Sequence, residues 1–213
     1  PAVVLGEGDL LGLLLAEDAR LQHEVLEVPL VGLDPGQPRA RERAATEQVL
    51  KLLAENKRVA LVSDAGTPGI SDPGAILVQA VRAAGFRVTP VPGPSALAAA
   101  LSVAGIAAQR ILFCGFLPAK ASARRNAIAE LGNRPEALVF YEAPHRVLEC
   151  VEDLAAGMLH PEQRRLVIAR EITKLYESVH ECVLEEAADW LRGDPDRPRG
   201  EFVLILSGLE AVE

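Results

Sequence analysis

The sequence predicts an α/β protein of two domains, with a parallel sheet in the N-terminal domain and a mixed sheet in the C-terminal domain. Two observations lead to this prediction: short β-branched runs alternate with amphipathic segments, and turns rich in glycine and proline separate them. Strands that alternate with helices at this spacing predict a parallel sheet with helices on both faces. The length of 213 residues allows one large domain or two smaller ones.

The N-terminal domain is expected to span residues 1–108. Val59–Val62 is typical of a buried strand, and Arg39–Asn56 of a helix with a polar face. After a glycine-rich turn, Asp72 is expected to cap the next helix by accepting amide hydrogen bonds, and Gly85 to end it. The apolar stripe of that helix is Ile76, Leu77, Ala80, Val81 and Ala84. Further strands are expected at 25–28 and 87–91, and a helix from Ser95 to about Ala104.

The C-terminal domain is expected to span residues 109–213, because the pattern changes at Ile111 after a boundary within 107–110. A basic helix is predicted at 123–131. A second helix carries Val147, Leu148, Val151, Leu154 and Met158. Strands are predicted at 111–114, 137–141, 166–169, 176–182 and 201–207.

Composition excludes several classes of protein. No run approaches the ~20 apolar residues that cross a bilayer, and no basic segment precedes the apolar start at residues 1–5. We therefore expect a cytoplasmic protein with no membrane association. Three scattered cysteines and four scattered histidines predict neither a disulfide framework nor a metal site. The net charge of −8 argues against general coating of nucleic acid but leaves room for a local basic face.

The turn Ser63–Gly74 is the most informative single segment. Its three glycines and two prolines allow a ligand to approach the main chain closely. It follows the carboxyl end of a predicted strand, where ligands of such sheets bind, and its junction with the next helix has free amides that suit an anion. Spacing alone leaves open whether the ligand carries a phosphate or a carboxylate, and whether the turn only caps a helix.

Six motifs occur in order: Val62–Pro68, Ser71–Gly74, Val91–Ala96, Gly115–Pro118, Tyr141–Arg146 and Ala169–Lys174. This set resembles the ribosomal RNA small-subunit methyltransferase I family, a branch of the tetrapyrrole methylase superfamily. The resemblance covers about residues 59 to 207. It implies a two-domain enzyme that binds S-adenosylmethionine in the cleft between its domains. It also implies a homodimer that methylates the 2′-hydroxyl of a cytidine near the decoding centre of small-subunit ribosomal RNA.

The same resemblance implies a set of cofactor contacts. The methionine end of the cofactor would be lined by Asp64, Ala65, Gly66, Thr67 and Ile70. Ser95 and Ala96 would make a second contact, while Leu117 and Ala169 would contact the adenosine largely through their main chain. The N-terminal part departs from the family pattern, because the expected Pro-Thr-Pro-Ile-Gly-Asn-type turn does not follow Leu5. Our hypothesis is that loop residues are missing between Leu5 and Gly6.

Methyl transfer to an alcohol needs an in-line approach to the methyl group and loss of the hydroxyl proton. The candidate catalytic residues are Lys174, Glu142, His145 and Glu171, which belong to the last two motifs. Lys174 would act as a base only if burial or a neighbouring cation lowers its pKa. Glu142 has the alternative of an ion pair with Arg146, four residues on. His145 is of a type that serves as a base near neutral pH, with the alternative that after Pro144 it only caps or stacks. Of the four, Lys174 and Glu142 are the preferred candidates.

RNA contacts are expected from Lys120, Arg124, Arg125 and Arg146, and such contacts would make binding depend on salt. Phe116, Phe140 and Tyr141 could stack on unpaired bases or could equally belong to the core. Two other functions remain open: a precorrin or uroporphyrinogen methyltransferase of the same superfamily, and a non-catalytic module that binds nucleotides or RNA. Transfer of a labelled methyl group to small ribosomal subunits separates the three.

Overall fold

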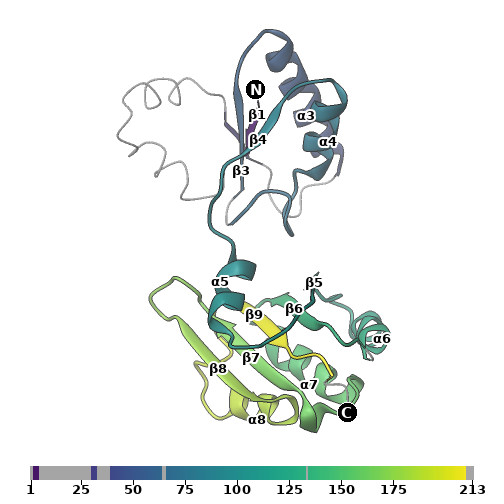
Figure 1. Ribbon diagram of the computed structural model, residues 1–213, viewed down its shortest axis with the longest axis vertical. Coiled ribbons are helices and arrows are strands. Elements are labelled where there is room, and N and C mark those ends of the chain that lie inside the picture. Colours follow the sequence, from purple (N-terminus) through teal and green to yellow (C-terminus); the bar gives the residue numbers. More distant parts are fainter. Residues whose placement is uncertain (1, 5–29, 33–38, 64–65, 133, 210–213) are drawn as a thin grey trace. The chain divides into compact units, whose positions relative to one another are not determined.

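The computed structural model describes residues 2–4, 30–32, 39–63, 66–132 and 134–209 (Figure 1). The chain forms two compact units, Pro1–Ser95 and Ala96–Glu213. The division lies before helix α5 (Ala96–Val103), whereas the sequence pattern placed a boundary after residue 108. The physical reason is that Ala100 of this helix is buried in an apolar cluster formed with strands of the second unit.

The first unit contains a sheet of four parallel strands in the order β2 (Leu30–Gly32), β3 (Val59–Val62), β1 (Ala2–Val4) and β4 (Val88–Pro90). The predicted parallel sheet is therefore confirmed. Since all four strands run the same way, their carboxyl ends lie along one edge of the sheet. The strand predicted at 25–28 and the junction of Leu5 with Gly6 lie outside the described residues.

Two helices pack on this sheet, α3 (Arg39–Ala54) and α4 (Ala75–Ala83), and Figure 1 shows them side by side. Their apolar faces meet the side chains of β3 that point the same way, in a cluster made of Val49, Leu53, Val59, Leu61, Leu77 and Val81. Both helices follow the predictions closely. The predicted cover on the other face of the sheet is not tested by the described residues and stays a prediction.

The start of α4 is capped differently from the prediction. The helix begins at Ala75, after Gly74. A carboxylate oxygen of Glu42, on α3, accepts hydrogen bonds from the amides of Gly74 (3.0 Å) and Ile76 (3.2 Å). Gly74 has a φ of 134°, and a Cβ there would lie 3.1 Å from a methyl group of Leu61. Glu42 thus caps the helix in the way expected of Asp72, and it also ties α3 to α4.

The second unit contains a mixed sheet of five strands, as the sequence predicted. Their spatial order is β5 (Ile111–Phe116), β6 (Ala137–Glu142), β9 (Phe202–Leu206), β7 (Arg165–Arg170) and β8 (Ser178–Val183). The pair β5–β6 is parallel, while the pairs β6–β9, β9–β7 and β7–β8 are antiparallel. The last strand of the chain therefore lies in the centre of the sheet.

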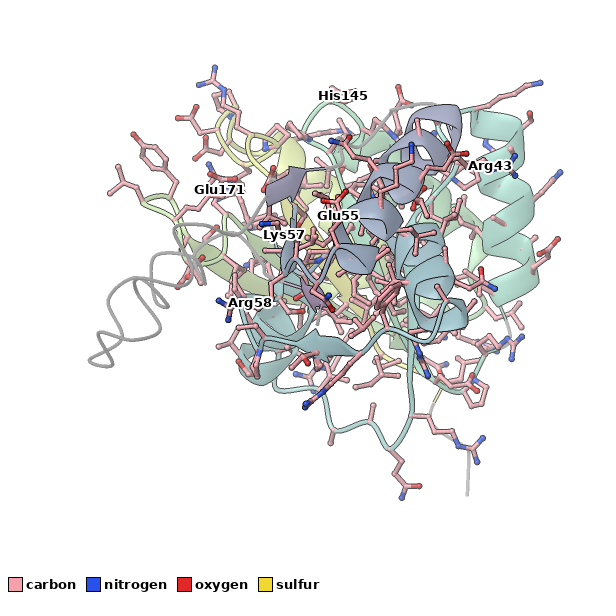
Figure 2. The ribbon with its side chains drawn as sticks, turned by 90° about the horizontal axis from the view of Figure 1, so that it is seen from above. Arg43, Glu55, Lys57, Arg58, His145 and Glu171 are labelled. Carbon is pink, nitrogen blue, oxygen red and sulfur yellow. The ribbon has the colours of Figure 1, made fainter. Side chains whose placement is uncertain are left out.

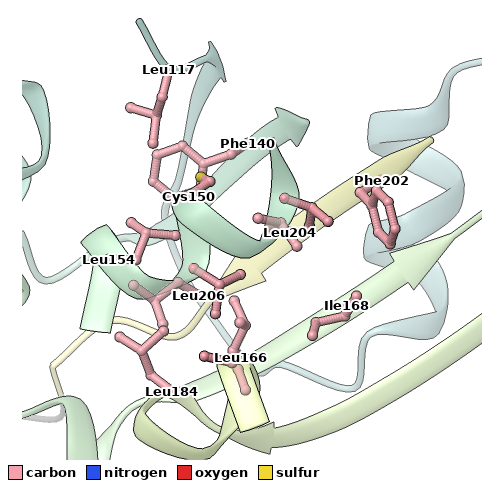
Figure 3. Close-up of a cluster of buried hydrophobic side chains, with 14 of the residues drawn as sticks. Leu117, Phe140, Cys150, Leu154, Leu166, Ile168, Leu184, Phe202, Leu204 and Leu206 are labelled. Atoms are coloured by element: carbon pink, nitrogen blue, oxygen red, sulfur yellow. The ribbon is translucent and has the colours of Figure 1, made fainter. Parts of the chain in front are cut away.

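The three central strands β6, β9 and β7 are buried on both faces: alternate residues along a strand point to opposite faces, and both sets are buried here. One face carries Leu138, Phe140, Leu166, Ile168, Phe202, Leu204 and Leu206, which form the larger cluster shown in Figure 3. The opposite face carries Val139, Val167, Ala169, Val203 and Ile205, which pack against α5. The near-continuous apolar runs in these strands follow directly from this two-sided burial.

Three helices follow the strands of the second unit: α6 (Ala121–Leu131), α7 (Val147–Gly157) and α8 (Ala187–Arg192). Short 3-10 turns lie at Pro161–Gln163 and Leu184–Glu186. The helix α8 was not predicted, since six residues are too few to show a helical period. No helix in the described part of the chain is long and apolar enough to cross a membrane.

We predict that Leu154→Ala destabilises the second unit by about 2–5 kcal/mol, because Leu154 is fully buried in the cluster of Figure 3 and its loss leaves a cavity. The matched control is Leu175→Ala, which truncates a leucine that is 88% exposed, with an expected effect below about 0.5 kcal/mol. Urea unfolding measures both variants. Equal effects of the two substitutions would contradict the assignment of this core.

Candidate functional site

Two loops at the carboxyl edge of the first sheet are joined by a hydrogen bond. The hydroxyl of Thr67, in the loop after β3, donates to the carbonyl of Pro94, in the turn after β4 (3.0 Å). The loop after β3 is also braced from within, since the Ser63 hydroxyl donates to the carbonyl of Gly66 (3.0 Å). The predicted contacts Gly66 and Thr67 are thereby brought next to the segment that leads into Ser95. Asp64 and Ala65, which belong to the same predicted contacts, lie outside the described residues.

The remainder of this loop presents an apolar side chain. Ile70 is 46% exposed. It lies in a turn in which its own amide donates a hydrogen bond to the carbonyl of Thr67 (3.2 Å). An exposed isoleucine held by a tight turn is compatible with the predicted contact to a ligand. The expectation of an anion at the junction with α4 needs correction, because the amides of Gly74 and Ile76 are already bound to the Glu42 carboxylate.

The turn after β6 contains a buried ion pair. The Glu142 side chain is fully buried, and its carboxylate lies 3.3 Å from the guanidinium of Arg146 and accepts a hydrogen bond from the Ala143 amide (2.9 Å). Arg146 also donates to the main-chain carbonyl of Leu117 (2.6 Å). Burial raises the pKa of Cys150, next to this pair, and the Glu142 carboxylate raises it further. The alternative considered for Glu142, an ion pair with the arginine four residues further along the chain, is therefore the arrangement observed.

The neighbouring Tyr141 connects β6 to α5. Its hydroxyl accepts a hydrogen bond from the Leu97 amide (3.1 Å), and its ring lies edge-on to Phe113 and Phe116. The sequence did not predict the hydrogen bond between Tyr141 and Leu97, because it showed Tyr141 only as an aromatic residue at the end of a strand. Of the three candidate stacking residues, Phe140 is fully buried, Tyr141 is half-buried and Phe116 is 53% exposed.

The predicted adenosine contacts occupy two different settings. Leu117 is buried directly after β5, with its carbonyl bound to Arg146. Ala169 is buried within β7, where it is paired with both β8 and β9. Ser95 and Ala96 precede and begin α5. Their contacts with a ligand stay predictions.

The loop after β7 is held in an uncommon conformation. Glu171 and Thr173 both have positive φ, at 49° and 68°. The Glu171 carboxylate accepts hydrogen bonds from the Glu201 amide (2.8 Å) and from the Lys174 ammonium (3.3 Å). A Cβ at Gly200 would lie 2.5 Å from Cγ of Glu171, so glycine is required there for the Glu171 side chain to fit. Gly200 and Glu201 were not identified from the sequence.

This network keeps Lys174 in its protonated form, which cannot accept a proton from the substrate. A hydrogen bond to the Glu201 carboxylate (2.8 Å) raises the pKa of Lys174, and the Glu171 carboxylate adds to the effect. The hydrogen bond from the Glu201 amide lowers the pKa of Glu171, and Lys174 adds to it. The condition set for Lys174 as a base, a lowered pKa, is therefore not met.

His145 and Glu171 lie on separate loops of the second unit, as Figure 2 shows. His145 is exposed in the turn before α7. Among the described residues no group of three or more histidines, cysteines and acidic residues could hold a metal ion.

The predicted RNA-binding cations divide into two kinds. Lys120 is exposed, and the Arg125 side chain is 68% exposed although it pairs with Asp153 (2.8 Å). Arg124 is buried, where it bonds to Asp153 (2.6 Å) and Glu149 (3.2 Å), and Arg146 is held by Glu142. The prediction of RNA contacts is therefore wrong for the buried guanidinium of Arg124, which solvent does not reach, and Arg146 is turned toward Leu117.

We predict that Arg124→Ala lowers the free energy of unfolding by about 1.5–3 kcal/mol, because it removes the buried partner of the Asp153 carboxylate and leaves that carboxylate with the largely exposed Arg125. The control is its neighbour, Arg125→Ala, with an expected loss of about 0–1 kcal/mol, since that side chain is largely exposed. Chemical denaturation at pH 7 measures both. A loss from Arg125→Ala as large as from Arg124→Ala would contradict this assignment.

The pH dependence of the same pair can also be predicted. Burial by itself would raise the pKa of Asp153, but hydrogen bonds from Arg125 and Arg124 outweigh it, and the pKa lies below its ordinary value of 3.8. The stabilisation is then present above pH 3.8 and is lost as the pH falls through the lower, folded value.

Comparison with known proteins agrees with the fold and the motifs. A family model described as Tetrapyrrole (Corrin/Porphyrin) Methylases matches residues 3–188. A protein of Xylella fastidiosa named ribosomal RNA small subunit methyltransferase I is 46% identical over 201 residues, which are 92% of this chain and 71% of the relative. A protein of Escherichia coli O157:H7 with the same name is 43% identical over 206 residues, 94% of this chain and 70% of the relative.

Solved structures share the fold at low identity. The methyltransferase CobJ has a TM-score of 0.64 at 19% identity, covering 100% of this chain and 95% of that chain. The uroporphyrin-III C-methyl transferase of Thermus thermophilus, solved with S-adenyl homocysteine, has a TM-score of 0.59 at 16% identity, covering 97% and 96%. The chain therefore belongs to the tetrapyrrole methylase family, and within it to the group of ribosomal RNA small subunit methyltransferase I proteins.

Proposed function

We propose that this protein transfers a methyl group from S-adenosylmethionine to the 2′-hydroxyl of a cytidine in small-subunit ribosomal RNA, near the decoding centre. The observation that carries the proposal is the identity of 46% and 43% to two proteins named ribosomal RNA small subunit methyltransferase I. The matches extend over 92% and 94% of the chain. The nucleotide and the position on the ribose come from the family resemblance.

The loop after β3 suits the methionine end of the cofactor. Thr67 is anchored to Pro94, and Ile70 is exposed on the same loop, so small and apolar groups are held beside Ser95. We assign Gly66, Thr67 and Ile70 to the methionine end, together with Asp64 and Ala65, and Ser95 and Ala96 to the second contact. Leu117 and Ala169 are assigned to the adenosine.

The bound cofactor supplies an electrophilic methyl group on a sulfonium. The protein must place the ribose hydroxyl in line with that methyl and accept the hydroxyl proton. Glu142 is committed to Arg146, and Lys174 is held as an ammonium by two carboxylates. Glu171 has a lowered pKa and is therefore a weak acceptor of a proton. We assign the base to His145, whose side chain is exposed.

RNA contacts are assigned to the exposed cations Lys120 and Arg125, around the start of α6. The phosphate backbone would then bind locally despite the net charge of −8. Phe116 is the exposed aromatic residue closest in sequence to this region, and it is our candidate for stacking on an unpaired base.

The proposal is tested by incubating the protein with methyl-labelled S-adenosylmethionine and small ribosomal subunits that lack the modification. We expect label in the ribosomal RNA, in a nucleotide that resists alkaline cleavage because its 2′-oxygen is methylated. Uroporphyrinogen III and a precorrin serve as competing substrates. Label in a tetrapyrrole and none in RNA would establish the alternative enzyme, while cofactor binding without any transfer would establish a non-catalytic module.

The identity of the base gives a second prediction. His145→Ala should lower kcat by about 10²–10⁴-fold, the usual contribution of a general base. Lys174→Arg should keep activity to within about tenfold, because an arginine cannot lose its proton and yet can still bind both carboxylates. Single-turnover methylation measures both variants. Inactive Lys174→Arg beside active His145→Ala would return the base role to Lys174.

We also propose that the protein acts in the cytoplasm and, from the family resemblance, that it is a homodimer. Sedimentation equilibrium of the purified protein tests the assembly, and fractionation of cells that express the full protein tests the location.

A further inference from the structure

The turn Tyr141–Arg146 contacts two segments that the proposed function assigns to the cofactor. We propose that this turn positions the start of α5 and the segment at Leu117 for S-adenosylmethionine, through the Tyr141 hydroxyl and the Arg146 guanidinium. The inference rests on the proposed function for the identity of the ligand. It makes Tyr141 and Arg146 positioning residues, and it gives Glu142 the task of holding Arg146.

The first contact is at the amino end of α5. The first amides of a helix have no partner within the helix, and the amide of Leu97 donates to the Tyr141 hydroxyl instead (3.1 Å). The phenol is held in place by edge-on contacts with Phe113 (5.0 Å between ring centres) and Phe116 (5.8 Å). The position of Ala96, next to Leu97, is thereby coupled to the end of β6.

The second contact is at the segment after β5. Arg146 donates to the carbonyl of Leu117 at 2.6 Å, a short distance typical of a charge-assisted hydrogen bond. The same guanidinium lies 3.3 Å from the Glu142 carboxylate, which compensates its charge. A planar guanidinium can hold two acceptors in a fixed geometry, which a flexible ammonium does less well.

Burial decides between a positioning and a catalytic role. The Glu142 side chain is 0% exposed and that of Arg146 is 18% exposed. Neither is therefore placed to exchange a proton with an RNA strand or to contact its phosphates. The turn continues β6, which is paired with β5 and β9 and is therefore firmly placed. One rigid corner thus fixes two cofactor segments that are far apart in the sequence, and such pre-organisation reduces the ordering that binding requires.

The test uses substitutions that remove single contacts. Tyr141→Phe removes only the hydroxyl, and we expect it to weaken binding of S-adenosylhomocysteine about fivefold. Arg146→Ala should weaken binding by about tenfold or more, and Arg146→Lys should fall between it and the wild type. Calorimetry measures the Kd. The rate of amide hydrogen exchange should rise at Ala96–Ala98 in Tyr141→Phe and at Leu117–Ala119 in Arg146→Ala.

Two control variants make the same chemical changes elsewhere. Tyr176→Phe alters an exposed tyrosine, and Arg192→Lys alters an arginine that pairs with Glu152 and Asp189 on the surface. Both should leave the Kd and the exchange rates unchanged. Thermal melting distinguishes a general loss of stability from a loss of positioning. A general loss of stability would lower Tm without a selective change in Kd or in hydrogen exchange at the two segments.

The outcomes distinguish this inference from the function on which it rests. Wild-type binding of S-adenosylhomocysteine without methylation of RNA would overturn the proposed function but leave the positioning role standing if Tyr141→Phe and Arg146→Ala weaken binding. Methylation by the wild type, with an unchanged Kd and unchanged exchange in both variants, would overturn the positioning role alone.

Discussion

Burial of the three central strands β6, β9 and β7 on both faces is the constraint on which the second unit depends. Each of these strands presents alternate residues to α7 and α8 on one side and to α5 on the other, so a shift of one residue would exchange two apolar sets of different size. The central position of β9 adds pairing on both of its edges. The turn Tyr141–Arg146 continues β6 and is therefore held in place by the sheet. Tyr141 and Arg146 make their contacts from this fixed position.

The first unit depends on the edge of a parallel sheet and on two polar clamps. The loops after β3 and β4 lie at the same edge because the strands are parallel neighbours of β1. A hydrogen bond from Thr67 joins those two loops, and hydrogen bonds to Glu42 join α3 to the start of α4. Each of these hydrogen-bonded contacts gives a partner to main-chain groups, the Pro94 carbonyl in one and the Gly74 and Ile76 amides in the other. A glycine-rich loop is thereby given a defined shape without a rigid side-chain core of its own.

Charged residues show where reasoning from sequence reaches its limit. Arg124 and Arg125 are adjacent and look alike in the sequence, yet one is buried and the other is largely exposed. A helix turns by about 100° per residue, so neighbouring side chains face different surroundings. Lys174 has the same problem, because one of the two carboxylates that raise its pKa comes from a distant segment. Glu201, which binds Lys174, is 27 residues away.

The sequence by itself determined the class of fold, the family, and the order of the strands and helices from α3 to β9 except α8, because hydrophobic periodicity and ordered turn motifs are local properties of the chain. Only the tertiary structure decided that α5 belongs with the second unit, that Glu42 caps α4, and that Arg146 faces Leu117. Those outcomes depend on which distant groups meet. A carboxylate that lies free on a helix and one that caps another helix have the same local sequence, and packing alone distinguishes them.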